Sequence, residues 1–120
     1  MKHTQTVLIV EDVVAIAAEL AAVLSDIGFS RIRIAHSLPD AEAVVAVSRP
    51  DIAVLDVNLG AGSQTIDLGL ALQASDTQVI FTSGYAQIDL SPAIAAFPFL
   101  EKPVSVAMIQ DTIQRFLGQA

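Results

Sequence analysis

Acidic, hydroxyl and basic residues follow four apolar segments of this chain, at points where strands would end. Glu11 and Asp12 come directly after the apolar run 7–10, and Asp56 follows the run 52–55. The corresponding places after the later apolar runs hold a hydroxyl pair and a lysine: Thr82, Ser83 and Lys102. In an open parallel sheet, ligands bind outside the carboxyl ends of the strands. We therefore expect three carboxylates, a hydroxyl and a lysine to share one cleft.

The chemistry of such a cleft favours a hard divalent cation, because three clustered carboxylates repel one another. Mg²⁺ suits the site, since it takes one or two carboxylates, a carbonyl oxygen and several waters. A cation there neutralises an incoming phosphoryl group, while hydroxyl and ammonium groups hold its remaining oxygens. An aspartate carboxylate is a competent nucleophile for such a group. The residue types thus predict Mg²⁺-dependent phosphoryl transfer to an aspartate.

Taken one at a time, these residues have ordinary structural interpretations. Glu11 and Asp12 could cap the following helix, favoured by its dipole. Asp56 could be a loop residue after a buried strand, and hydroxyl residues end many strands. A strand that ends in a lysine–proline pair, as at Lys102, is less common. The functional interpretation depends on all of these residues reaching the same edge of one sheet.

The segments that would position these residues alternate between short apolar runs and stretches with helical spacing. The expected strands are residues 6–10, 31–35 (more exposed than the others), 52–55, 79–82 and 97–100. The expected helices are residues 13–27, 37–48 and 66–74, a weakly encoded turn or two at 91–96, and a closing helix that contains 109–117. Gly28 is the expected stop of the first helix, and Ser37 the expected N-cap of the second. This alternation predicts an α/β fold with a parallel sheet and helices on both faces.

Length and composition agree with one such domain over residues 1–120. Hydrophobic residues make up 53% of the chain and charged residues 16%, which suits a sheet that is buried on both faces. No apolar stretch is long enough to span a membrane, and the start lacks a signal peptide. We therefore expect a soluble, cytoplasmic protein.

Several function classes are excluded by the same numbers. The chain has no cysteine, so disulfides and thiolate metal sites are absent. Its net charge of −7, with six lysines and arginines, leaves no basic patch for nucleic acid. His3 and His36 lack the spacing of metal ligands and are expected to be ordinary surface or loop residues.

The polar strand ends lie within longer motifs. These are VLIVED at residues 7–12, VLDVN at 54–58, VIFTSGY at 79–85 and FLEKP at 99–103. In this order they resemble the successive signatures of response-regulator receiver domains, and the likeness covers essentially the whole chain. The resemblance implies a flavodoxin-like, doubly wound five-stranded sheet in the strand order 2-1-3-4-5. It also implies that a histidine kinase or a phosphotransfer protein phosphorylates Asp56, and that the resulting change in conformation controls a downstream protein partner.

The resemblance further implies a role for each site residue. The Mg²⁺ ligands would be three carboxylates and one backbone carbonyl, from Glu11, Asp12, Asp56 and Asn58. Lys102 would pair with the phosphoryl oxygens, and the peptide bond before Pro103 would be cis. Phe99 would be the switch aromatic, where many receivers have tyrosine; phenylalanine lacks the hydroxyl.

Two adjacent residues compete for the role of the hydroxyl that meets the phosphoryl group. Neighbouring strand residues point to opposite faces, so only one of them can reach it. In the family the residue after this hydroxyl is small, and Gly84 behind Ser83 fits that pattern better than Ser83 behind Thr82. We expect Ser83, with Thr82 as the alternative.

Some features depart from the usual receiver pattern. The segment 56–83 is about one helical turn short, and the fourth helix is weakly encoded, which puts in doubt signalling through the usual fourth-helix and fifth-strand surface. The Gly84–Tyr85 pair and the short fourth helix are similar to a subgroup of single-domain receivers from alphaproteobacteria. No output segment follows the closing helix, so the effect is expected to pass to another protein, from a monomer or a weak homodimer.

Two other functions compete with this interpretation. An aspartate-nucleophile phosphohydrolase would need a second acid two residues after the nucleophile, where this chain has Asn58. A receiver-like interaction module that works without phosphorylation would be expected to have lost site residues, which are all present, but an intact site does not prove its use. The second of these remains the alternative.

Overall fold

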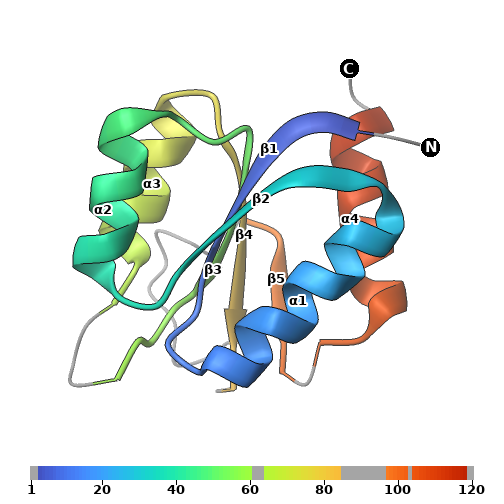
Figure 1. The fold of residues 1–120 in the computed structure, drawn as a ribbon, viewed down its shortest axis with the longest axis horizontal. Coiled ribbons are helices and arrows are strands. Elements are labelled where there is room, and N and C mark those ends of the chain that lie inside the picture. The colour runs from blue at the N-terminus through green and yellow to red at the C-terminus, as the bar shows by residue number, and fades with distance from the viewer. Residues whose placement is uncertain (1–2, 61–63, 85–96, 103, 119–120) are drawn as a thin grey trace.

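Residues 3–60, 64–84, 97–102 and 104–118 are described by the computed structural model, and they form a parallel sheet between two layers of helices (Figure 1). The strands are β1 (His3–Val10), β2 (Phe29–Ala35), β3 (Ile52–Asp56), β4 (Gln78–Ser83) and β5 (Phe99–Glu101). The helices are α1 (Val14–Ile27), α2 (Leu38–Val47), α3 (Ile66–Ala74) and α4 (Val106–Gly118). The sheet order is β2-β1-β3-β4-β5 with all pairs parallel, so the predicted fold and strand order are confirmed.

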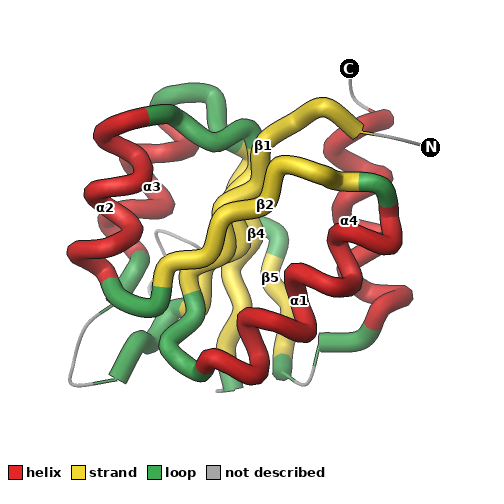
Figure 2. The backbone as a smooth tube through the Cα atoms, viewed as in Figure 1, coloured by secondary structure: helices red, strands yellow, loops and turns green. Residues whose placement is uncertain are grey.

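The helices cover the two faces of the sheet in pairs, α1 with α4 on one face and α2 with α3 on the other (Figure 2). Successive strand residues alternate between two apolar cores. Val54 and Ile80 belong to the core under α1 and α4, whereas Leu55 and Phe81 belong to the core under α2 and α3. This alternation later decides which side chains share a face with Asp56.

Glycine and serine set two of the helix ends as predicted. Gly28 has a φ of 127° and turns the chain directly from α1 into β2, so that Phe29 already lies in the strand and in the core. This tight turn is why β2 begins two residues before the predicted start at residue 31. The Ser37 hydroxyl accepts a hydrogen bond from the amide of Asp40, which confirms it as the N-cap of α2.

The predicted start of the fifth strand, residue 97, was wrong by two residues. β5 covers Phe99–Glu101, because these residues pair with Phe81, Thr82 and Ser83 of β4. Phe97 lies outside the ladder, and its ring instead packs against that of Phe81, with centroids 5.3 Å apart. The expected turn at 91–96, Tyr85 and the bond before Pro103 lie outside the described residues.

Helix α3 lies unusually close to the sheet at Gly69. A Cβ atom at this position would overlap the ring of Phe81 and would lie 3.3 Å from Leu55. The missing side chain therefore lets α3 pack directly on β3 and β4, next to the strand ends that carry the polar residues. No described helix is long and apolar enough to cross a membrane.

Candidate functional site

The carboxyl ends of the central strands reach the same edge of the sheet. Val10 of β1 pairs with Leu55 of β3, so the following residue, Glu11, lies level with Asp56. Asp56 in turn pairs with Thr82 of β4. The strand register therefore brings residues more than forty positions apart to one place, as the sequence pattern predicts for a parallel sheet.

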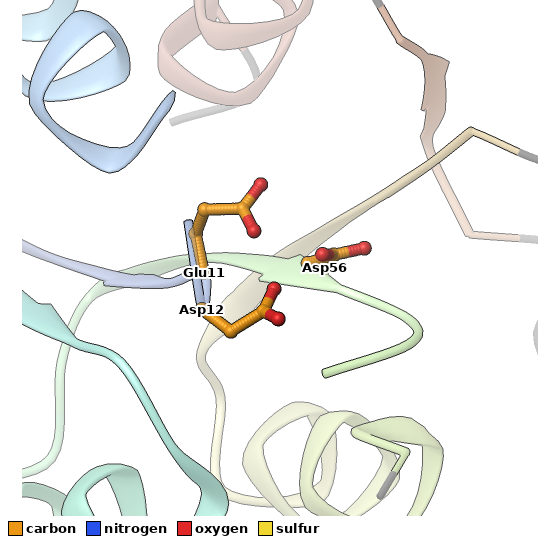
Figure 3. Close-up of side chains that lie close together, drawn as sticks. All are labelled: Glu11, Asp12 and Asp56. Atoms are coloured by element: carbon orange, nitrogen blue, oxygen red, sulfur yellow. The ribbon is translucent and has the colours of Figure 1, made fainter. Parts of the chain in front are cut away.

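An acidic cluster occupies this edge, and its side chains converge (Figure 3). Glu11, Asp12 and Asp56 each offer one carboxylate oxygen, and these oxygens lie within 4.8 Å of one another. Glu11 is 1% exposed and Asp56 5%, whereas Asp12 is exposed to solvent. Two of the three carboxylates are thus buried, and a buried charge without a partner is energetically costly.

Lys102 lies between the two buried carboxylates. Its Nζ donates hydrogen bonds to Glu11 Oε1 at 2.6 Å and to Asp56 Oδ2 at 3.0 Å. Burial by itself would lower the pKa of Lys102, but its hydrogen bonds to Glu11 and Asp56, together with the charges of those two groups, raise the pKa above its ordinary value. The lysine is therefore a permanent cation at neutral pH.

The charges of the cluster do not balance without a further cation. Three ionised carboxylates against one ammonium leave a net charge of −2. Carboxylate oxygens are the ligands that Mg²⁺ and Ca²⁺ prefer, and an exposed member such as Asp12 leaves room for the waters that Mg²⁺ retains. The donor set and its charge therefore fit a hard divalent cation.

Asn58 lies in the loop between β3 and α3, beside this cluster. The amide of Val57 continues the sheet by donating to the Thr82 carbonyl, and Asn58 then forms an isolated antiparallel bridge with Gln64. Gly60 has a φ of 73°, and a Cβ on it would lie 3.2 Å from Asp12 Oδ2. The loop therefore passes directly against the acidic cluster.

The two candidate hydroxyls lie at different places relative to Asp56. Thr82 is in register with Asp56 and shares its face of the sheet, where it lines a cavity of about 580 Å³ together with Leu20 and Lys102. Ser83 is the last residue of β4 and belongs to the opposite face by alternation. Both side chains are buried, and a Cβ on the following Gly84 would meet no atom within 4 Å.

The remaining predicted residue, Phe99, lies on β5 and is half-buried against the core under α2 and α3.

Three features of the site were not predicted. Glu11 Oε2 accepts a hydrogen bond from the amide of Val13, the N-cap residue of α1, but no side chain caps the helix itself, so the capping interpretation of Glu11 and Asp12 was wrong. His36, interpreted as an ordinary surface residue, has its Nδ1 3.0 Å from the Glu11 carbonyl. Thr65 is fully buried and donates to the carbonyl of Asp56. The only signal for Thr65 in the sequence is a hydroxyl residue directly before a helix, which normally indicates a cap rather than a tie to a strand.

Comparison with known proteins agrees with this geometry. The chain matches the family described as Response regulator receiver domain over residues 7–114. A receiver domain (CheY-like) from Methylobacillus flagellatus shares 28% identity and a TM-score of 0.80, covering 94% of this chain and 98% of that one. The PhyR response regulator REC domain of Erythrobacter litoralis shares 25% identity and a TM-score of 0.78, covering 95% and 90%. No curated protein matched the chain.

A parallel sheet with an acidic cluster and a lysine at its carboxyl edge, and a family match over nearly the whole chain, define the class of protein. The chain belongs to the response regulator receiver domains of two-component signalling systems.

Proposed function

We propose that the protein accepts a phosphoryl group on Asp56, in a Mg²⁺-dependent reaction, from a histidine kinase or a phosphotransfer protein. The observation that carries this proposal is the position of the Asp56 carboxylate, which lies close to the carboxylates of Glu11 and Asp12 and accepts a hydrogen bond from the ammonium of Lys102. A buried aspartate in this setting has a nucleophilic oxygen, a cation to offset its charge and further carboxylates to hold a metal ion.

The proposed ligands of the cation are Glu11, Asp12, Asp56 and the backbone carbonyl of Asn58. A bound Mg²⁺ supplies charge neutralisation to the oxygens of the incoming phosphoryl group. An Asp56 oxygen attacks phosphorus, the phosphorus–nitrogen bond of the donor's phosphohistidine breaks, and the released imidazole takes up a proton. Lys102, which now pairs with Glu11 and Asp56, then contacts the phosphoryl oxygens.

Ser83 is the proposed switch hydroxyl, with Thr82 as the alternative. Ser83 ends β4 and adjoins the open space at Gly84, which favours it. Thr82 shares the face of Asp56 and lines the cavity with Leu20 and Lys102, which is the observation in favour of the alternative. Phosphorylation leaves roughly two negative charges on the phosphoryl group at Asp56, where the carboxylate alone carried one, and Ser83 and Lys102 move to meet them. The surface around Ser83 and Phe99 then changes, and a protein partner in the bacterial cytoplasm binds to the altered surface.

A second function, as an interaction module that is never phosphorylated, has one observation in its favour. Lys102 already satisfies both buried carboxylates through ion pairs, so the cluster has a structural role without any phosphoryl group. The two functions differ in whether Asp56 reacts, which a single assay decides.

The test is phosphorylation by a small acyl-phosphate donor, followed by intact mass. Wild type is expected to gain one phosphoryl group only when Mg²⁺ is present, and Asp56→Asn none. Asp51→Asn is the matched control, because Asp51 lies just before the same strand at its opposite end. Absence of a mass gain in a folded wild type that binds Mg²⁺ would favour the interaction module. In the same assay Ser83→Ala should slow the reaction more than Thr82→Val, and the reverse order would assign the hydroxyl to Thr82.

A further inference from the structure

The loop between β3 and α3 is closed at its base as a small hairpin. The amide of Thr65 donates to the Val57 carbonyl at 3.1 Å, and Asn58 bridges to Gln64 in antiparallel orientation. Gln64 Nε2 also donates to Asn58 Oδ1 at 3.1 Å. The residues that follow β3 are thus hydrogen-bonded to the residues that precede α3, immediately beside Asp56.

This pairing determines where the backbone of Asn58 points. In an antiparallel pair, hydrogen-bonded positions alternate with positions that are not hydrogen-bonded across the pair. Because the flanking Thr65 amide bonds to the Val57 carbonyl, the pair of Asn58 and Gln64 is of the second kind. The carbonyl of Asn58 is therefore directed away from the Gln64 segment, as a metal ligand at this position requires.

Thr65 is the residue that ties this hairpin to the strand. Its side chain is fully buried, and Oγ1 donates to the Asp56 carbonyl at 2.9 Å. Its own carbonyl accepts from the Gly69 amide, which is the first hydrogen bond of α3. One residue thereby connects the end of β3, the base of the loop and the start of α3.

Gly60, two residues after Asn58 in the same loop, is also restricted in position. Gly60 has a positive φ, and a Cβ on it would press on Asp12 Oδ2 at 3.2 Å. A shift of the loop base would therefore move Gly60 against or away from Asp12, as well as moving Asn58. Two of the proposed cation ligands depend on where this loop lies.

We propose that Thr65 is a positioning residue of the cation site, which holds the Asn58 carbonyl and the Asp56 backbone in the arrangement that Mg²⁺ requires. This role rests on the proposed Mg²⁺-dependent function. Thr65 acts through Asn58 and Asp56 and does not contact the cation itself. Partners that orient metal ligands in this way typically contribute about 10-fold to 100-fold to metal affinity.

The test is the Kd for Mg²⁺ of the folded, unphosphorylated protein, measured by isothermal titration calorimetry. Thr65→Val keeps the shape and loses the donor, and it is expected to weaken Mg²⁺ binding about 10-fold or more. Thr65→Ser keeps the donor and should bind Mg²⁺ within about 3-fold of wild type. Rescue by serine separates the hydrogen bond from the packing of the side chain.

Thr77→Val is the matched control. Thr77 is also a buried threonine, and its Oγ1 donates to the Pro50 carbonyl at 2.7 Å, but it lies at the opposite end of the sheet. Both valine variants remove one buried hydroxyl donor to a carbonyl, although the Pro50 carbonyl keeps a hydrogen bond from Arg49, so Thr77→Val should lose some stability as well. Only Thr65→Val should change the Kd for Mg²⁺.

Each outcome decides the proposal. Equal Mg²⁺ affinity of wild type, Thr65→Val and Thr77→Val would overturn the positioning role and leave the proposed function intact. A folded wild type that binds no Mg²⁺ would overturn the proposed function, and this role with it. If Thr65→Val does not fold, Thr65→Cys replaces it, because a thiol is a weak donor of similar size. Binding by the cysteine variant as tight as by the serine variant would then contradict the proposal.

Discussion

The two ends of the sheet use polar residues in opposite ways. At the amino ends of the strands, the Asp51 carboxylate accepts from the amide and hydroxyl of Thr6, and Thr77 donates to the Pro50 carbonyl. At the carboxyl ends, Glu11, Asp12 and Asp56 share one lysine. At the amino ends, each of these polar side chains has a hydrogen-bond partner. At the carboxyl ends, the three carboxylates carry more negative charge than the ammonium of Lys102 neutralises.

This difference agrees with the proposed function, in which the amino end of the sheet is structural and the carboxyl end binds a ligand. Hydrogen bonds between Asp51 and Thr6 join β3 to β1 and need nothing from solution. A buried cluster with surplus charge is a cost to the fold unless a ligand completes it. Predictions that change one end and leave the other alone test whether this separation is real.

The largest effect is expected from Lys102→Met in the absence of Mg²⁺. The substitution leaves two buried carboxylates without their cation, and the free energy of unfolding should fall by about 2 kcal/mol, less than for a fully buried pair because Lys102 is partly exposed. Mg²⁺ should restore more stability to the variant than to wild type, and bind it more tightly, because no ammonium competes for the same oxygens. Urea unfolding with and without Mg²⁺ measures both effects.

Arg115→Met controls for the loss of one positive charge. Arg115 pairs with Asp111 on the surface of α4, and both side chains are 68% exposed. Its substitution should change stability by less than about 0.5 kcal/mol and leave the response to Mg²⁺ unaltered. If Lys102→Met and Arg115→Met change the free energy of unfolding and the response to Mg²⁺ equally, the surplus negative charge at the carboxyl end has no effect on stability or on Mg²⁺ binding.

A smaller effect is expected from Asp51→Ala at the amino end. Loss of the hydrogen bonds to the Thr6 amide at 2.8 Å and to its hydroxyl should cost about 1 to 2 kcal/mol of unfolding free energy. The Kd for Mg²⁺ should stay as in wild type, because Asp51 is separated from the cluster by the length of β3. Weaker Mg²⁺ binding in a folded Asp51→Ala protein would mean that the two ends are coupled through the strands.

The fold was predictable because it follows from local patterns that repeat along the chain. Each strand or helix can be identified from its own residues, by an apolar run or by helical spacing. Gly28 and Ser37 likewise indicate helix ends without knowledge of the neighbouring elements. The strand bounds were less predictable, since they depend on the partner strand. β5 is Phe99–Glu101 because of its pairing with β4, and no property of residues 97–101 alone would have excluded Phe97.

The clustering of Glu11, Asp12 and Asp56 was predictable for the same reason, but the hydrogen bonds around these residues were not. Strand ends converge by topology, so Glu11 and Asp56 could be placed together from the sequence. The hydrogen bond from Thr65 to the Asp56 carbonyl joins residues nine positions apart. It depends on the path of the intervening loop, which the sequence does not specify. The close approach of Gly60 to Asp12 is likewise a product of that path.

The smallest effect is expected in the pH dependence of stability, and it concerns Lys102 alone. Burial lowers its pKa, but the hydrogen bonds to Glu11 and Asp56 prevail and hold the pKa above the ordinary value of 10.5. A group whose pKa is raised on folding stabilises the protein fully below its unfolded pKa, and this contribution is lost as pH rises through the folded pKa.

The stability difference between wild type and Lys102→Met should therefore be constant from neutral pH to about pH 10 and shrink only above the ordinary lysine pKa. Taking the difference removes other groups that titrate in alkali in both proteins. Urea unfolding across this range, in Mg²⁺-free buffer, provides the measurement. A difference that already shrinks between about pH 7 and pH 9 would mean that burial outweighs the two carboxylates, so that the ammonium is easily lost. In that case Lys102 would lose its proton easily. The net charge of the cluster would then depend on pH, and the argument that this charge favours a divalent cation would have to be revised.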